Sequence, residues 1–208
     1  MPSKYYHRNF KPQYFYHIFN RGAYKNKVFL DKKDYQVFTE ILIYYLTFPT
    51  AKHFSYKNRA INPYVKVPNL NIDSVYLVSY CLMPNHFHLL LKQLPLATKQ
   101  TDISNLMRRL SITYAMYFQY KYKHTGSLFE SKFKSVTVDS TEQLLYLSRY
   151  IHQHQTPYSS YPTYLNKIKL PNWLHPEYIL KLQKNYQQFV ESPIKETNTK
   201  KIESLTLD

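Results

Sequence analysis

The first half of the chain alternates between strand-like and helix-like patterns of apolar residues. Residues 14–21, YFYHIFNR, are rich in aromatic and β-branched residues and stop at Gly22, which predicts a strand. Residues 33–48 predict a helix, because apolar side chains recur there at helical spacing: Tyr35, Phe38, Ile41, Leu42 and Tyr45. The apolar run VYLVSYCL, residues 75–82, predicts a central strand. Residues 86–93, HFHLLLKQ, predict its hairpin partner across the turn MPN.

The second half continues the alternation. Residues 102–122 predict a long helix with one apolar stripe: Ile103, Leu106, Met107, Leu110, Tyr114, Tyr117 and Phe118. Residues 128–138, LFESKFKSVTV, alternate like a strand or an irregular hairpin. A last helix starts with the capping pattern of Ser140 and Gln143 and ends before Pro157. The order β-α-β-β-α-β-α is typical of an α+β fold, an antiparallel sheet with covering helices in the split-βαβ, ferredoxin-like arrangement.

The length of 208 residues fits a single domain, which we place at residues 14–190. Residues 1–13 are expected to form a flexible N-terminal segment. Residues 49–73 contain three prolines among lysines and asparagines, so a loop or insertion is expected there. The polar residues 191–208 predict a disordered tail.

The charge of the chain is strongly positive, with 28 Lys and Arg against 13 Asp and Glu, a formal +15. Such a field favours polyanions such as nucleic acid. Many of the 23 tyrosines stand beside lysine, as in AYKNK, SYKNR and YKYKH. That mixture suits single strands, since phosphates need cations and unstacked bases need flat partners. Tyrosines that pack in the core and lysines that keep the protein soluble would explain about half of the pattern equally well.

Composition also argues against several classes of protein. The longest apolar stretch, VFTEILIYYLTF, contains Glu40 and is too short to span a bilayer, and the N-terminus lacks the apolar core of a signal peptide. The single cysteine, Cys81, excludes an internal disulfide and fits a cytoplasmic protein. The two glycines are isolated, which excludes P-loops and dinucleotide-binding fingerprints.

Four side chains form a candidate site. His86 and His88 are two residues apart on a predicted strand, so they point to the same face. Tyr150 and His154 share the shoulder of the last helix at i, i+4 spacing. These three imidazoles and one phenol could converge on a metal ion or a phosphate. The alternative is that the histidines are ordinary core-edge or solvated residues and that Tyr150 is an amphipathic-helix tyrosine like Tyr146.

Six motifs resemble, in order, the REP-associated tyrosine transposases of the single-tyrosine HUH superfamily: YHIFNRG, YCLMPNHFHLLL, ISNLMRRLSITYAMYF, GSLFESKFKSVTVDS, YLSRYIH and YSSYPTYL. The resemblance covers roughly residues 14–48 and 75–175. It implies an HUH-nuclease fold that cleaves and rejoins single-stranded DNA on hairpin or REP-type repeats through a 5′-phosphotyrosine. The expected location is the nucleoid. Relatives include monomers and dimers that exchange the tyrosine helix, so a homodimer stays open.

The resemblance also implies roles for individual residues. His86 and His88 correspond to two metal ligands and Tyr150 to the nucleophile. The third ligand of the family, a Gln or Asn four residues after the tyrosine, corresponds to His154, which departs from the family pattern. Mg or Mn is the expected cofactor, with Zn or Co as alternatives because three imidazoles are softer donors. His152 lies off this face and is not expected to take part.

Basic residues supply the predicted contacts with DNA phosphates. Those candidates are Arg108, Arg109, Lys121, Lys123, Lys132 and Lys134.

Two other functions compete with the transposase-like enzyme. A DNA-hairpin-binding protein on the same fold could have weak or lost chemistry, with the departure at His154 as its mark. A hydrolase could use the histidines to activate water, but no carboxylate is placed in the sequence to act as its base.

Overall fold

The computed structural model of the chain describes residues 9–50, 74–99, 101–154 and 156–193. Its elements are β1 (Phe15–Arg21), the 3-10 helix η1 (Ala23–Lys25), α1 (Lys32–Thr47), β2 (Val75–Met83), β3 (His86–Gln93), α2 (Ile103–Tyr122), β4 (Lys134–Val138), α3 (Thr141–Gln153), α4 (Tyr161–Tyr164), α5 (Glu177–Leu180) and α6 (Tyr186–Glu191).

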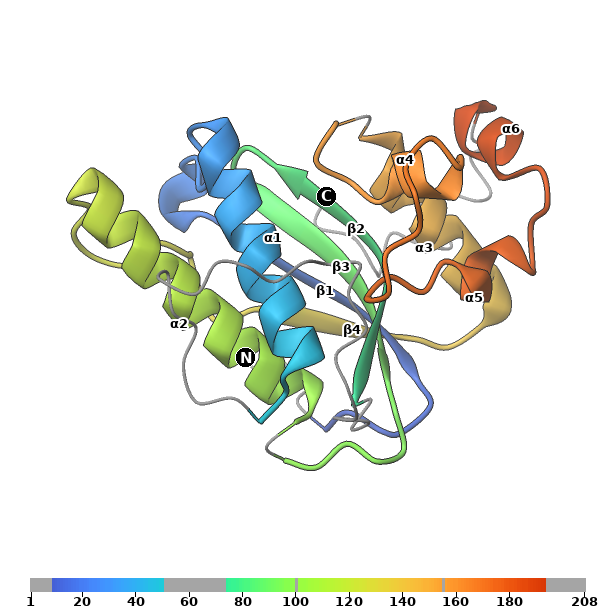
Figure 1. Cartoon of the computed structure of the whole chain (residues 1–208), viewed down its shortest axis with the longest axis horizontal. Coiled ribbons are helices and arrows are strands. Elements are labelled where there is room, and N and C mark those ends of the chain that lie inside the picture. The colour runs from blue at the N-terminus through green and yellow to red at the C-terminus, as the bar shows by residue number, and fades with distance from the viewer. Residues whose placement is uncertain (1–8, 51–73, 100, 155, 194–208) are drawn as a thin grey trace.

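The four strands form one sheet in the order β2-β3-β1-β4, and every neighbouring pair is antiparallel. The hairpin partner β3 lies between β1 and β2, which α1 connects, so the connection is a split βαβ unit (Figure 1). The predicted α+β, ferredoxin-like fold is confirmed.

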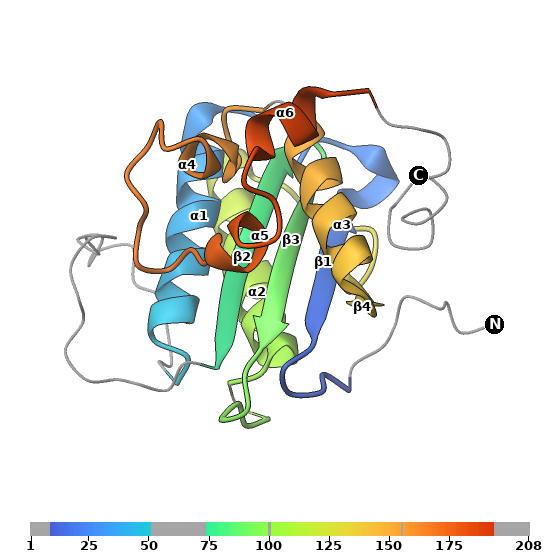
Figure 2. The same cartoon turned by 90° about the vertical axis from the view of Figure 1, so that its right-hand side faces the viewer.

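The two faces of the sheet have different helical covers. Figures 1 and 2 show α1 and α2 on one face and α3 with α4, α5 and α6 on the other. Alternation along β3 produces this division, because Phe87, Leu89 and Leu91 belong to the core beneath α1 and α2. Leu90 faces the other way, into the smaller core with Leu147 and Ile151 of α3. The side chains of His86 and His88 therefore lie on the α3 face.

A buried carboxylate joins α1 to α2. Asp34 is fully buried and accepts hydrogen bonds from Lys121 (2.8 Å), Tyr117 (2.8 Å) and Tyr122 (2.8 Å). Burial alone would raise the pKa of Asp34, but the Lys121 ammonium and the other donors hold this pKa below its usual value. Lys121, a candidate for DNA contacts, thus holds the two helices together.

Most predicted elements agree with the structure to within one or two residues. The exception is the segment 128–138, in which only β4 is a strand. Leu128, Phe129 and Phe133 are all buried, and this spacing breaks the two-residue alternation that a strand requires.

Several predictions lie mostly outside the described residues. These are the flexible segment 1–13, the insertion 49–73 and the tail 191–208. Among the helices that the structure describes, none has the length and apolar character needed to cross a membrane.

Candidate metal centre and tyrosine site

Two histidines of the site come from the start of β3. His86 lies opposite Arg21 and His88 opposite Phe19 in the β1–β3 register, and both project from the same face. Phe87 between them is fully buried in the opposite core, against Phe38. The strand therefore holds the two imidazoles one pleat apart.

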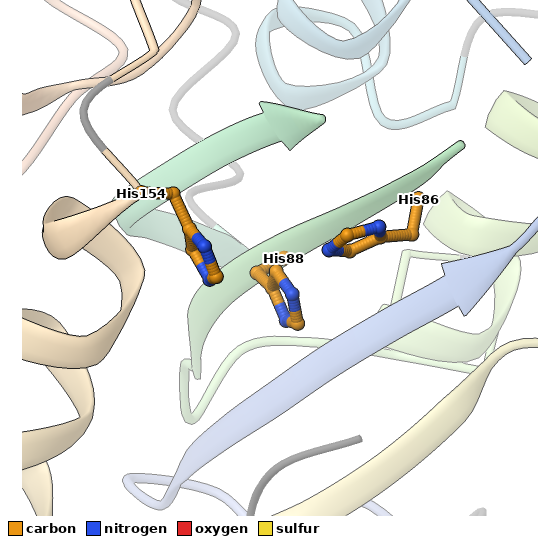
Figure 3. Close-up of side chains that lie close together, drawn as sticks. All are labelled: His86, His88 and His154. Carbon is orange, nitrogen blue, oxygen red and sulfur yellow. The ribbon is translucent and has the colours of Figure 1, made fainter. Parts of the chain in front are cut away.

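The third histidine comes from the end of α3. His154 is the C-cap residue of this helix, and Figure 3 shows its ring pointing toward those of His86 and His88. The ligand nitrogens of the three rings all lie within 4.8 Å of one another. Two nitrogens bound to one ion at about 2.1 Å lie at most about 4 Å apart, so the three rings would have to close slightly to share one metal ion.

The outer hydrogen bonds of the two strand histidines orient their rings alike. His86 Nδ1 lies 2.7 Å from Oδ1 of Asn85, and His88 Nδ1 lies 2.9 Å from Nε2 of His17. Both rings therefore use Nδ1 for an outer partner, which leaves Nε2 for the centre. His88 Nε2 is buried and has no hydrogen-bond partner among the described residues. A buried ring nitrogen without a hydrogen-bond partner is suited to bind a metal ion.

Electrostatics keep His88 in the form that binds metals. Burial lowers the pKa of His88 well below its usual value, and the neighbouring imidazoles of His17, His86 and His154 lower it further. The imidazole is thus neutral at physiological pH, as coordination requires.

Tyr150 lies at the side of the histidine cluster. Its ring centroid is 5.4 Å from that of His88 and 5.0 Å from that of His154, and both contacts are edge to face. The ring is half-buried, so the phenol stands at the edge of the contact between α3 and the sheet. The structure thus brings together all four residues that the sequence pointed to.

Two neighbours of these residues have other contacts. His152 is fully buried and bonds the Tyr186 hydroxyl through Nδ1 and Ser160 Oγ through Nε2, each at 2.7 Å. Tyr146, one helical turn before Tyr150, packs against Phe189. Both side chains serve packing between α3 and the C-terminal segment.

Sequence reasoning missed two residues that contact the histidines, His17 and Asn85. His17 stands in the aromatic stretch YFYHIFNR. A polar side chain within an otherwise apolar strand was the only sign in the sequence that His17 has a polar partner. Asn85 belongs to the MPN turn and immediately precedes His86, so its closeness to the site was visible in the sequence.

The six candidates for DNA contacts are in different situations. Arg108 and Lys132 are exposed and line one groove. Arg109 stacks over the Tyr45 ring at 4.0 Å and donates to the Pro49 carbonyl, and Lys134 pairs with Glu130 at 3.0 Å. Lys123 lies over the Tyr120 ring. Their roles in DNA binding stay predictions.

The groove that Arg108 and Lys132 share has a volume of about 760 Å³ and runs between α2 and residues 126–133. Lys99 adds a third cation, and Met107 and Phe129 are among its apolar lining. Among the described residues, no carboxylate contributes to this lining. The groove thus combines cations with an apolar floor.

Comparisons with known proteins agree with this geometry. A model of the family "Transposase IS200 like" matches residues 66–154. No curated protein sequence matches the chain.

Two solved structures are similar to the chain. The structure of a REP-associated tyrosine transposase bound to a REP hairpin has a TM-score of 0.53 at 12% identity, and the match covers 81% of this chain and 89% of that one. A crystal structure from Deinococcus radiodurans R1, described as that of a transposase, has a TM-score of 0.40 at 20% identity, with 70% and 94% covered. Because the sequence identity of the first match is only 12%, this match supports the fold and nothing further.

The matched family segment contains the two strand histidines, the helix tyrosine and His154. The resemblance read from the motifs is therefore confirmed. Over residues 66–154, the chain is similar to the family of IS200-like transposases.

Proposed function

We propose that the protein cleaves and rejoins single-stranded DNA, with Tyr150 as the nucleophile and with His86, His88 and His154 holding a divalent metal ion. The observation that carries this proposal is the position of the Tyr150 ring, which lies against the rings of His88 and His154. A phenol beside a cluster of metal-ligand type is the arrangement that a tyrosine nucleophile needs.

The residues present fit a metal, as the buried Nε2 of His88 and the closeness of the three ring nitrogens indicate. When bound, a divalent cation supplies Lewis-acid polarisation of the scissile phosphate. Mg or Mn is the cofactor expected from the family, and Zn or Co suits the three imidazoles.

The tyrosine would carry the covalent step. Tyr150 Oη forms a bond to phosphorus while the bond from phosphorus to the 3′ oxygen breaks, and the phenolic proton ends on the released 3′ hydroxyl. The product is a 5′-phosphotyrosine, and attack by a 3′ hydroxyl reverses the step. One phosphodiester replaces another, so no nucleotide energy source is needed. A phenol with a pKa near ~10 is a weak nucleophile at neutral pH, so the position of Tyr150 beside the centre must supply part of the activation.

The groove between α2 and residues 126–133 supports a path for the DNA strand. Asn20 lines this groove, and the next residue, Arg21, lies opposite His86 in the sheet. Part of the groove lining therefore lies near the end of β1 that carries the metal centre on the other face of the sheet. We infer that the single-stranded flank of a hairpin crosses this end. Action on chromosomal DNA would place the protein in the cytoplasm, at the nucleoid.

A covalent-adduct experiment tests the proposal. The protein is incubated with Mn²⁺ and a hairpin oligonucleotide that carries single-stranded flanks and a label on the 3′ side of the cleavage point. We expect a labelled protein band on a denaturing gel, because the 5′ phosphate of that fragment stays on the tyrosine. Tyr150→Phe should abolish the band, whereas Tyr146→Phe, one turn earlier on α3, should retain it.

An adduct that persists in Tyr150→Phe would exclude this residue as the nucleophile. Strand cleavage without a protein-linked product would indicate activated water instead. Tight hairpin binding without any adduct under Mg²⁺, Mn²⁺, Co²⁺ or Zn²⁺ would favour the alternative, a binding protein on the same fold.

A further inference from the structure

The buried contact between His17 and His88 lies behind the candidate metal centre. His17 Nε2 and His88 Nδ1 are 2.9 Å apart, and both rings are fully buried. The ring planes differ by only 20°, and the contact joins two ring nitrogens, so the rings meet edge to edge. This geometry is that of a hydrogen bond between two imidazoles, with one shared proton.

The sheet register makes this contact. Phe19 of β1 lies directly opposite His88, and His17 is two residues earlier on the same face, opposite Leu90. His17 is therefore the diagonal neighbour of His88, within reach of a large side chain. Like His88, it is fully buried.

The position of the shared proton decides what His88 can do. A proton on His17 Nε2 would be donated to His88 Nδ1, and a neutral His88 would then carry its own proton on Nε2. This Nε2 is buried without a hydrogen-bond partner among the described residues, so the N–H would be left unsatisfied and aimed at the centre. A proton on His88 Nδ1 leaves a lone pair on Nε2, as metal coordination requires.

We propose that His17 is a positioning residue for the metal centre, and that its Nε2 accepts the Nδ1 proton of His88 and thereby fixes the ligand tautomer of His88. The inference rests on the proposed metal site but not on cleavage. Asn85 does the same for His86 on the exposed side, where its Oδ1 can only accept from His86 Nδ1. The two strand ligands would thus each have a dedicated acceptor.

Metal affinity tests the proposal without reference to activity. Binding of Zn²⁺ or Mn²⁺ is measured by competition with a chromophoric chelator in three variants. His17→Leu removes the acceptor and should raise the Kd of the metal about 10- to 100-fold. His17→Gln keeps an acceptor oxygen and should recover most of the affinity. Leu144→Ala, which creates a cavity in the same α3 core, should lower thermal stability with an unchanged metal Kd.

His17→Leu with reduced stability but unchanged metal affinity would show a purely structural role and overturn the proposal, as would equal losses in the Leu and Gln variants. A second measurement does not depend on any variant that could fail to fold. In ¹⁵N-histidine-labelled protein loaded with Zn²⁺, the proposal requires the proton on His88 Nδ1 and a scalar coupling to His17 Nε2. A proton on His17 Nε2 would contradict it. Metal binding with this tautomer but no DNA adduct would leave the inference standing and remove the nuclease function.

Discussion

A third imidazole at position 154 determines the chemical softness of the proposed metal centre. The IS200-like family is expected to place an amide there, which is a hard oxygen donor suited to Mg²⁺. An imidazole instead favours borderline metals such as Zn²⁺ and Co²⁺ over Mg²⁺. His154 lies at the end of α3 with its ring facing His86 and His88. An imidazole in place of an amide at this position would therefore change the set of atoms that bind the metal.

We therefore predict that His154→Gln shifts the metal preference of the protein. The Kd for Zn²⁺ should rise about tenfold or more, a loss of about 1.4 kcal/mol, while the yield of adduct with Mg²⁺ relative to Mn²⁺ should increase. Chelator competition and adduct yields measure the two effects. His175→Gln is the matched control, since this half-buried histidine pairs with Glu177 outside the centre. An unchanged preference would show that His154 contributes no ligand.

The sequence pointed to the four residues of the candidate site but not to the residues that contact its histidines from behind. His86 and His88 share a face because of strand alternation, and Tyr150 and His154 share one because of helical spacing, so local rules sufficed. The contact from His17 depends on which residue of β1 lies opposite His88. That register is set by strand pairing that brings together two histidines 71 residues apart in the sequence. No local pattern contains this information.

At the scale of elements, periodic segments were predicted well and aperiodic ones were not. All seven apolar-stripe residues predicted for α2 are buried, because a helix at the surface of a core must turn its apolar side inward. The segment before β4 is held instead by backbone bonds to the end of β1, with Glu130 N donating to Arg21 O. The C-terminal segment likewise bonds the edge of β2, where Ser160 N donates to Tyr80 O. Bonds between segments far apart in the sequence do not affect the spacing of apolar residues, so that spacing could not predict these two segments.

The groove beside α2 gives a prediction about DNA binding. Removing the charges of Arg108 and Lys132 together, as Arg108→Gln with Lys132→Gln, should weaken binding to single-stranded DNA. It should also reduce the magnitude of the salt slope of log K by about 1.4, since each lost phosphate contact on a single strand is worth about 0.7. Fluorescence anisotropy at salt concentrations from about 50 to about 200 mM provides the slope.

A charge-matched control separates this site from a general effect of charge. Lys167→Gln with Lys181→Gln removes two exposed cations from the C-terminal segment, outside the groove lining. This pair should leave the slope nearly unchanged. Equal effects of the two double variants would mean that DNA responds only to the overall charge, and the groove would lose its role.

At the scale of the whole molecule, one chain contains every part of the proposed site. The Tyr150 ring contacts the His88 ring of the same chain, and only Asp139 and Ser140 connect β4 to α3. The three backbone steps from Val138 to Thr141 span about 11 Å at most, which keeps the start of α3 close to the end of β4. The Ser140 cap on Gln143 N and the bond from Asp139 N to the Gln143 side chain hold this connection further. An exchange of α3 between two copies would have to break the contacts of Tyr150 with the His88 ring and of His154 with the strand histidines of the same chain.

The protein should therefore act with its own tyrosine rather than with that of a second copy. A mixture of Tyr150→Phe and His88→Ala, each inactive alone, should form no DNA adduct, because neither chain has both parts of the site. In a dimer that exchanges α3, the mixed species would combine the tyrosine of one chain with the histidine of the other, and the His88→Ala chain would become labelled. A size tag on one variant identifies the labelled chain, and a mixture of wild type with Tyr150→Phe shows that mixing itself is harmless. Adduct on the His88→Ala chain would prove that the tyrosine acts across subunits, and the contact of Tyr150 with its own histidines would then belong to a resting state.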